Sequence, residues 1–495
     1  MSNLVSDVLK VDPEAPKAVW NHFSEFCRHP RPSKHETKIR QYLKSVAEKN
    51  HLILKEDRVG NTIIYLPASK GHEHCKPVLI QNHIDMVTDA LPDIKIDFMN
   101  DPIRPIVHGE WVKATGTTLG ADNGIGACLA LAMIDHRDDI VHPPLELLFT
   151  IDEETGLTGA LELDASMIQA KVMLNIDTEE WGALYIGCAG GLEIKYQQEY
   201  QVLESLKDAS VVKVKVSGLV GGHSGLDIHR QRGNANVMLV DLLNLMKEKV
   251  DLIAMSGGKA HNIIPRNASV EFALDGLSHS EFQVLFDQWK MYWLKILPKE
   301  DRENFLAEYE ITKQKYSCIA KQTWLKCINS FLQQFPHGAH QFVMQEGETE
   351  PLVRLSNNFA KIQLNKGVFS LLTSIRFFEK DEGERFKEKC IQLGNLHGLK
   401  MEIKNGYPSW APDFNSHLLS KVIEVYQKNY GSKPQVKAIH AGLECGIILA
   451  KIPGMEAISM GPLIMGAHSP DEKVLIKDVT NTWHLLTFVL ADLVG

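Results

Sequence analysis

Three short apolar runs that each lead to an acidic or imidazole side chain constrain this chain more than any other feature. The runs precede His83, Glu154 and Asp177, and each has the length and composition of a buried strand. Strand-like and helix-like segments alternate around them, so the sequence predicts an α/β fold with a mostly parallel sheet and helices on both faces. Open sheets of this kind place their sites just beyond the carboxyl ends of the strands.

This alternation stops after about Gly187 and resumes near Tyr407. At 495 residues the chain is also too long for one core. We therefore expect a discontinuous α/β domain, which carries the site, and an inserted α+β domain with two possible units. The α/β domain would comprise residues 1–186 and 405–495, and the inserted domain residues 187–404. A helical, charge-rich connection is expected over residues 278–335.

The composition argues against several classes of partner. Asp and Glu number 62 against 53 Lys and Arg, a net charge of −9, and no long basic run occurs, which disfavours a nucleic acid or a membrane surface. No stretch approaches the ~20 uninterrupted apolar residues of a membrane helix. The first residues lack the features of a secretory signal, and the 8 cysteines form no CxxC pair. We expect a cytoplasmic protein with reduced thiols.

Five side chains far apart in the sequence are candidate metal ligands. They are two imidazoles and three carboxylates: His83, Asp122, Glu154, Asp177 and His468. Singly, most have an ordinary explanation, such as a helix cap for Asp122 or a surface turn for His468. A charge buried at Asp177 is harder to dismiss, because an unpaired buried charge is costly. With no thiolate, the set suits zinc, cobalt or manganese in a hydrolytic site better than a closed structural zinc site.

Two further carboxylates accompany these ligands. Asp85 follows His83 by two residues, so both would share one face of a strand end, and Asp85 could accept the second ring N–H of the imidazole. Glu153 and Glu154 are neighbours whose side chains would point differently, so one could bind a metal while the other faces a metal-bound water. A local pattern, Ser33 to Glu36, has the form of a capping box opening a helix.

Seven segments, in order along nearly the whole chain, resemble those of the aminoacyl-histidine dipeptidases, within the wider clan of co-catalytic di-zinc peptidases. They are residues 82–87, 116–126, 152–156, 175–180, 221–225, 439–446 and 468–472. The resemblance implies a zinc-peptidase-like fold and hydrolysis of dipeptides such as Xaa-His, with Cys-Gly also open. It also implies a cis peptide bond between Asp122 and Asn123.

The resemblance further implies two divalent ions, zinc foremost, bridged by Asp122. His83 and Asp177 would complete one metal site. Glu154 and His468 would complete the other. Two cations lower the pKa of a shared water, so hydroxide forms near neutral pH.

Other roles follow from the same resemblance. Glu153 would be the general base and Asp85 would orient the imidazole of the first metal site. The remaining residues would bind substrate: His223 at the oxyanion, Asn262 and Arg376 as lid residues, and Gly442 through backbone N–H groups.

Two alternative functions stay open at this point. An N-acyl amino acid deacylase would share the chemistry, and a free α-amine requirement would distinguish the two. An inactive binding homologue would have lost a ligand or Glu153, and all of these are present. We expect a homodimer, the commonest soluble oligomer. Whether His223 acts within its own chain or across subunits is left open.

Overall fold

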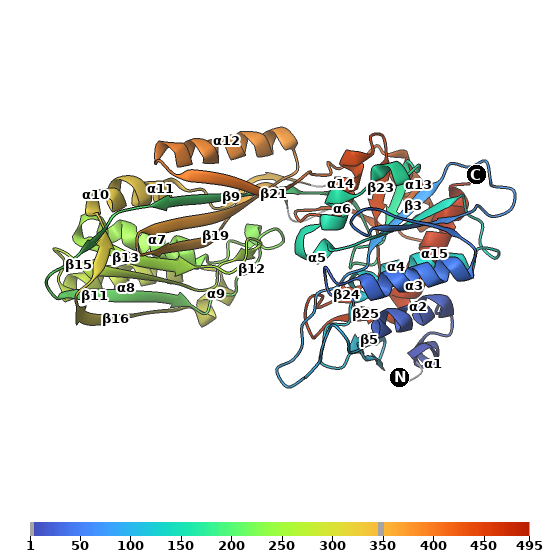
Figure 1. Ribbon diagram of the computed structural model, residues 1–495, viewed down its shortest axis with the longest axis horizontal. Coiled ribbons are helices and arrows are strands. Elements are labelled where there is room, and N and C mark those ends of the chain that lie inside the picture. The colour runs from blue at the N-terminus through green and yellow to red at the C-terminus, as the bar shows by residue number, and fades with distance from the viewer. Residues whose placement is uncertain (1–3, 345–350, 495) are drawn as a thin grey trace. The chain divides into compact units, whose positions relative to one another are not determined.

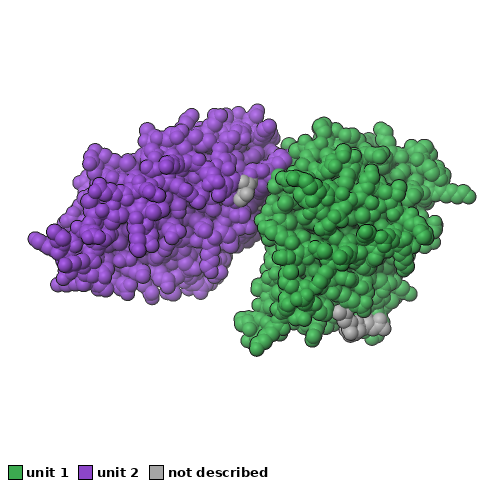
Figure 2. Space-filling view, in the orientation of Figure 1, with its two compact units in different colours: residues 1–188, 410–438, 443–495 green, residues 189–409, 439–442 purple. Residues whose placement is uncertain are grey.

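The computed structural model describes residues 4–344 and 351–494, which form two compact units (Figures 1 and 2). Unit 1 comprises residues 1–188, 410–438 and 443–495, and unit 2 comprises residues 189–409 and 439–442. The short segment 439–442, which includes Gly442, thus belongs to unit 2 although the chain on either side of it belongs to unit 1. No helix of the described residues is long and apolar enough to cross a membrane.

Unit 1 is built on a mixed sheet whose central strands are parallel. The strand order is β1 (Ile53–Glu56), β2 (Thr62–Leu66), β6 (Leu145–Thr150), β3 (Val78–His83), β7 (Val172–Asn175), β23 (Glu456–Ser459), β8 (Ala183–Cys188) and β22 (Gln435–Ile439). The pairs β6–β3, β3–β7 and β7–β23 are parallel, and β1–β2, β2–β6 and β23–β8 are antiparallel. Every residue of β3 and β6 is buried, as expected for strands covered on both faces. The expected mostly parallel arrangement is confirmed.

The helices of unit 1 include one that is buried almost throughout. Those of eight or more residues are α1 (Leu4–Val11), α2 (Lys17–Arg28), α3 (Thr37–Lys49), α4 (Ala121–Asp135), α13 (His417–Tyr430), α14 (Glu444–Lys451) and α15 (Ile476–Asp492). Small residues dominate α4, so other elements approach it closely on all sides. A second sheet has the order β24 (Ile464–Met465), β25 (Lys473–Leu475), β5 (Trp111–Ala114) and β4 (Pro105–His108).

The expected capping box before α3 does not form, and that prediction was wrong. The helix begins at Thr37, and its N-cap makes no side-chain hydrogen bond. The Ser33 hydroxyl instead donates to Asp85 at 2.7 Å. The Glu36 carboxylate accepts the backbone N–H of Asp152 at 3.1 Å. Both side chains are thus bound to distant residues, which a local pattern cannot reveal.

Unit 2 contains one continuous antiparallel sheet. Its order is β16 (Leu306–Gln314), β11 (Ala209–Ser217), β15 (Ala268–Leu274), β13 (Val250–Gly257), β19 (Leu352–Asn365), β20 (Val368–Phe377), β9 (Gly190–Glu199) and β21 (Lys400–Tyr407), with β18 (Gly338–Val343) also beside β19. The two α+β units that the sequence suggested therefore share a single sheet, joined where β13 pairs with β19.

Residues 278–335 are not a purely helical connection. They hold α8 (His279–Ile296) and α9 (Lys299–Asn304), but also β16, which pairs with β11 and extends the sheet. The sequence of β16, Leu-Ala-Glu-Tyr-Glu-Ile-Thr-Lys-Gln, is rich in charge because most of the strand is solvent-exposed. Because of these charged residues, the sequence did not indicate a strand here.

The two faces of this sheet differ in polarity. On β9, Leu192, Ile194 and Tyr196 face an apolar core that also contains Trp289 of α8. Their neighbours Gly191 and Glu193 point to the opposite face, because side chains alternate along a strand. Buried polar residues gather on that opposite face, at the end of the sheet where β9 begins.

Candidate metal centre

Three of the five expected ligands follow adjacent parallel strands of unit 1. His83 is the last residue of β3, Glu154 lies in the short helix α5 (Glu153–Gly156) after β6, and Asp177 follows β7. Since β6, β3 and β7 are parallel neighbours, their carboxyl ends meet at one edge of the sheet. The apolar runs therefore end together, and their polar successors converge there.

Asp122 connects the two imidazoles of the cluster. It lies at the start of α4, directly after Gly120 and Ala121, and its peptide bond to Asn123 is cis, as the resemblance implied. One carboxylate oxygen of Asp122 lies 3.1 Å from His83 Nε2. The other lies 3.1 Å from Nε2 of His468, in the turn after β24. A carboxylate whose two oxygens face different imidazoles has the arrangement of a metal bridge.

Two candidate ligand sets share this carboxylate. In the first, His83 Nε2 is 3.4 Å from Asp177 Oδ1, and Asp122 is the third member. In the second, His468 Nε2 is 3.0 Å from Glu154 Oε2, again with Asp122. Within each set the possible ligand atoms lie within 4.8 Å of one another. Imidazole nitrogens and carboxylate oxygens are ligands that zinc, cobalt and manganese accept, so the residues fit a pair of such ions.

Several buried carboxylates surround these imidazoles, so positive charge stabilises the cluster. Burial raises the pKa of Glu153 well above its ordinary value and that of Glu154 to about 7. Hydrogen bonds to Asp122 and Glu154 raise the pKa of His468 to about 11. In the absence of cations, protons are therefore retained at this edge. Divalent ions would supply the same charge and displace those protons.

Asp85 connects the imidazole of the first set to the glutamate pair. Its Oδ1 lies 3.4 Å from His83 Nδ1. The same carboxylate accepts the backbone N–H groups of Glu153 at 3.0 Å and Glu154 at 3.2 Å, in addition to the Ser33 hydroxyl. Asp85 therefore fixes the turn that carries the glutamates, a contact that the sequence analysis did not foresee.

Glu472 is an important residue to which the sequence analysis assigned no role. Its side chain is buried, with 2% of the residue exposed. It accepts four successive backbone N–H groups, those of Leu119, Gly120, Ala121 and Asp122, at 2.7, 2.9, 2.7 and 3.2 Å. Glu472 thus fixes the turn before α4, which presents the bridging carboxylate. Its position four residues after His468, within a segment already singled out, was the available signal.

The expected substrate-binding residues also meet within unit 2, which includes Gly442 although the sequence analysis placed that residue in the α/β domain. The Nη2 atom of Arg376, on β20, lies 3.4 Å from His223 Nε2. Asn262 precedes β14 (Ile263–Ile264), which pairs with β12 (Gly222–His223), and its carbonyl accepts the N–H of Ser224 at 2.8 Å. A Cβ atom on Gly442 would lie 2.8 Å from the ring of Tyr407, which itself accepts a hydrogen bond from Arg376.

A buried aspartate holds the loop that carries His223. Asp301 of α9 is fully buried and accepts the backbone N–H groups of Val220 and Gly233, both at 2.7 Å. These two amides lie at the beginning and end of the loop. No role for this part of the chain follows from the sequence, because the residues that Asp301 binds lie 68 and 81 positions away.

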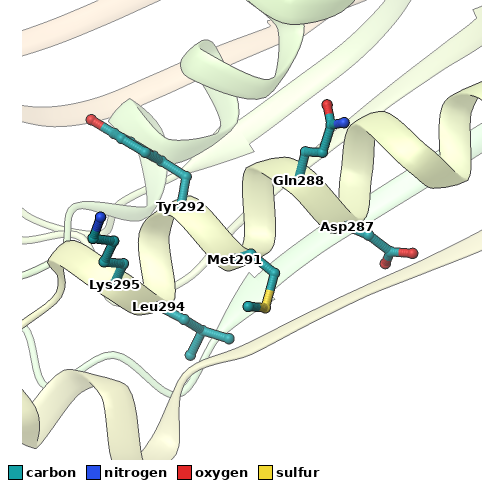
Figure 3. A pocket seen from close by; sticks show the side chains of 6 residues that line it. All are labelled: Asp287, Gln288, Met291, Tyr292, Leu294 and Lys295. Atoms are coloured by element: carbon teal, nitrogen blue, oxygen red, sulfur yellow. The ribbon is translucent and has the colours of Figure 1, made fainter.

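A hollow along α8 of unit 2 carries no comparable chemistry (Figure 3). Its lining consists of Asp287, Gln288, Met291, Tyr292, Leu294 and Lys295, without an imidazole or a thiol. The hollow therefore offers neither a metal-binding set nor a nucleophile with its base.

Comparisons with known proteins identify the family to which the chain belongs. Residues 79–492 match peptidase family M20/M25/M40, and the chain belongs to that family. It is 36% identical over 484 residues to the cytosol non-specific dipeptidase of Escherichia coli (strain K12), covering 97% of this chain and 98% of that protein.

Solved structures show the same fold. The crystal structure of aminoacylhistidine dipeptidase from Vibrio alginolyticus matches with a TM-score of 0.83 and 34% identity, covering 99% of each chain. Aminopeptidase PepT from Bacillus cereus matches with a TM-score of 0.56 and 14% identity, covering 97% of this chain and 100% of that one, a likeness of fold alone. The family resemblance and the fold class expected from the sequence are confirmed.

Proposed function

We propose that this chain is a metallodipeptidase that hydrolyses dipeptides with two divalent ions at the carboxyl ends of β3, β6 and β7. The observation that carries the proposal is Asp122, whose two oxygens each belong to a separate three-residue ligand set. Membership of the M20/M25/M40 peptidases and 36% identity to a dipeptidase support it. The name of that relative, a cytosol enzyme, supports the expected cytoplasmic location.

The residues around the metal positions have separate tasks. We assign one ion to His83 and Asp177 and the other to Glu154 and His468, with Asp122 shared, and zinc as the metal. When bound, such a pair lowers the pKa of a water so that hydroxide forms near neutral pH.

Glu153 is suited to act as the general base. Its backbone N–H is held by Asp85 at 3.0 Å, so its position is fixed independently of the metal ligands. A carboxylate held beside the metal positions can accept a proton and later return it. We propose that Glu153 takes the proton of the attacking water and delivers it to the leaving amine.

We propose that unit 2 binds the substrate. His223 would donate a hydrogen bond to the developing oxyanion, and Arg376 would pair with the C-terminal carboxylate. Asn262 and the backbone N–H of Gly442 would complete the binding groups. The proximity of His223 and Arg376, at 3.4 Å, supports a common task. We further propose that unit 2 is a lid and that the enzyme is a homodimer.

A substrate panel on metal-restored enzyme tests this function. Metal-free protein receives zinc, cobalt or manganese and is offered dipeptides, including Xaa-His and Cys-Gly, beside the corresponding N-acetyl amino acids. We expect two ions per chain and hydrolysis of dipeptides with a free α-amine. Preferential cleavage of the N-acetyl substrates would favour the deacylase alternative. A single ion per fully active chain would contradict the shared role of Asp122.

A further inference from the structure

Four residues form one row across four strands on the polar face of unit 2. They are Ser356 on β19, Arg376 on β20, Gly191 on β9 and Tyr407 on β21. The strand register pairs Ser356 with Arg376, Arg376 with Gly191, and Gly191 with Tyr407. Residues paired directly across strands point to the same face. Arg376 and Tyr407 therefore lie on either side of Gly191, on one face of the sheet.

The absent side chain of Gly191 provides the space in which they meet. A Cβ atom there would lie 2.5 Å from both Cζ and the hydroxyl oxygen of Tyr407, which is closer than such atoms approach. On another side, a Cβ on Gly442 would lie 2.8 Å from the same ring. The Tyr407 ring thus packs directly against two glycines. In this position its hydroxyl oxygen accepts a hydrogen bond of 3.0 Å from Nη1 of Arg376.

Arg376 has no carboxylate partner among residues 4–344 and 351–494. It is 5% exposed, and its Nε atom makes no hydrogen bond within those residues. The nearby buried carboxylate, Glu193, lies 3.2 Å from His261 Nδ1 instead. A buried guanidinium normally pairs with an anion, because desolvating its charge is costly. The remaining N–H groups of Arg376 are therefore available for an anionic ligand.

We propose that Tyr407 is a positioning residue for substrate recognition. Its hydroxyl fixes one end of the Arg376 guanidinium, so that the other N–H groups present a fixed pair of donors to the C-terminal carboxylate of the dipeptide. A flexible arginine loses conformational freedom on binding, and a contact made beforehand reduces that loss. This inference rests on the proposed function, since it assumes that Arg376 binds the carboxylate.

The test is Tyr407→Phe, which removes the hydroxyl and keeps the ring. KM and kcat are measured for a dipeptide, and kcat/KM for the same dipeptide as its C-terminal amide, which carries no charge for Arg376. We expect the dipeptide KM to rise about tenfold, near the lower limit for a hydrogen bond to a charged group. We expect kcat for the dipeptide, and kcat/KM for the amide, to stay within about twofold.

Tyr196→Phe is the matched control. Tyr196 lies on β9 but on the apolar face, where its hydroxyl donates to the Cys390 carbonyl at 3.2 Å. This variant should leave the dipeptide KM unchanged.

Gly191→Ala displaces the Tyr407 ring and should raise the dipeptide KM in the same way as Tyr407→Phe. The unfolding midpoint of Gly191→Ala is measured in parallel.

These variants distinguish the positioning role of Tyr407 from the proposed binding of the substrate carboxylate by Arg376. If Arg376→Lys raises the dipeptide KM and Tyr407→Phe does not, the positioning role of Tyr407 is rejected. That role is also rejected if Tyr407→Phe lowers kcat/KM equally for the dipeptide and for its amide. Such a result would indicate a structural role only. If Arg376→Lys leaves KM unchanged, the assignment of Arg376 in the proposed function fails instead.

Discussion

The two units of the molecule place their polar residues by different means. In unit 1 three of the five candidate ligands, His83, Glu154 and Asp177, lie at or just beyond the carboxyl ends of parallel strands. In unit 2, Arg376 and Tyr407 lie within antiparallel strands and meet through the register on either side of Gly191. The first region gathers carboxylates suited to cations, and the second gathers basic groups suited to an anion. Strand ends thus contribute to the candidate metal centre, while a strand face supplies the proposed recognition surface.

The largest expected effect concerns the glutamate pair of unit 1. Glu153→Gln should retain both metals and lower kcat by about 10² to 10⁴-fold, since only the proton acceptor is lost. Steady-state kinetics and metal content of the purified variant measure the two effects. Glu162→Gln, on the neighbouring helix α6 (Thr158–Glu162), serves as the exposed control and should leave kcat unchanged. Metal loss from Glu153→Gln would show that Glu153 and Glu154 have exchanged roles.

In unit 2, His223→Ala should lower kcat by about 10²-fold while both metals stay bound, because the lost donor acts on the oxyanion. His279→Ala, at the exposed start of α8, is the control.

Mixing His223→Ala with an Asp122→Asn variant then identifies the source of the imidazole. Recovered activity in mixed oligomers means that it acts across subunits. No recovery despite proven subunit exchange means that it acts within one chain.

A smaller effect is expected from the buried carboxylates that hold loops in the two units. Glu472→Gln replaces an acceptor of four backbone N–H groups and should weaken metal binding by about 10 to 100-fold, because the Asp122 turn loosens. Asp301→Asn, its counterpart in unit 2, should leave metal affinity unchanged and lower kcat by about tenfold, because the His223 loop loosens. Metal titration and kinetics on both variants check the contrast. Reduced metal affinity in Asp301→Asn would contradict it.

The smallest expected effect is on the pH dependence of stability, to which one buried group in each unit contributes with opposite sign. In unit 1, burial raises the pKa of Glu444 to about 7 from an ordinary 4.5, so the folded state retains a proton that the unfolded state loses. Its contribution to stability is full below pH 4.5 and is lost as the pH rises to about 7. In unit 2, burial lowers the pKa of His337 to about 4 from 6.5. Its contribution is full above pH 6.5 and is lost as the pH falls to about 4.

Unfolding of metal-free protein by urea, measured across pH 4 to 7, checks this pair of slopes. Each group contributes at most ~1.4 kcal/mol per pH unit to the free energy of unfolding. Glu444→Gln should remove a decrease in stability with rising pH. His337→Asn should remove an increase. Equal slopes in both variants and the parent protein would contradict both assignments.

Much of the fold could be predicted, and the residues that meet in the candidate metal centre could be named, because local signals were strong. The runs before His83 and Asp177 are buried strands, and their composition shows it. The residues that were missed act through contacts far along the chain. Glu472 binds amides 350 or more positions away, and Tyr407 depends on a strand register that no local pattern encodes. The mistaken capping box at Ser33 has the same origin, since its hydroxyl binds a residue 52 positions away.

The sharing of Asp122 between two ligand sets has a consequence for the order in which the protein is made. Asp122 and His468 are 346 residues apart, whereas His83, Asp122 and Asp177 all belong to the first half of the chain. A growing chain emerges with its N-terminal part first. The first ligand set is therefore synthesised long before the second, which stays incomplete until His468 has been added. On the proposed ligand assignment, a nascent chain can hold at most one of the two ions in a full set of ligands, so the proposed two-metal site is complete only after His468 has been added.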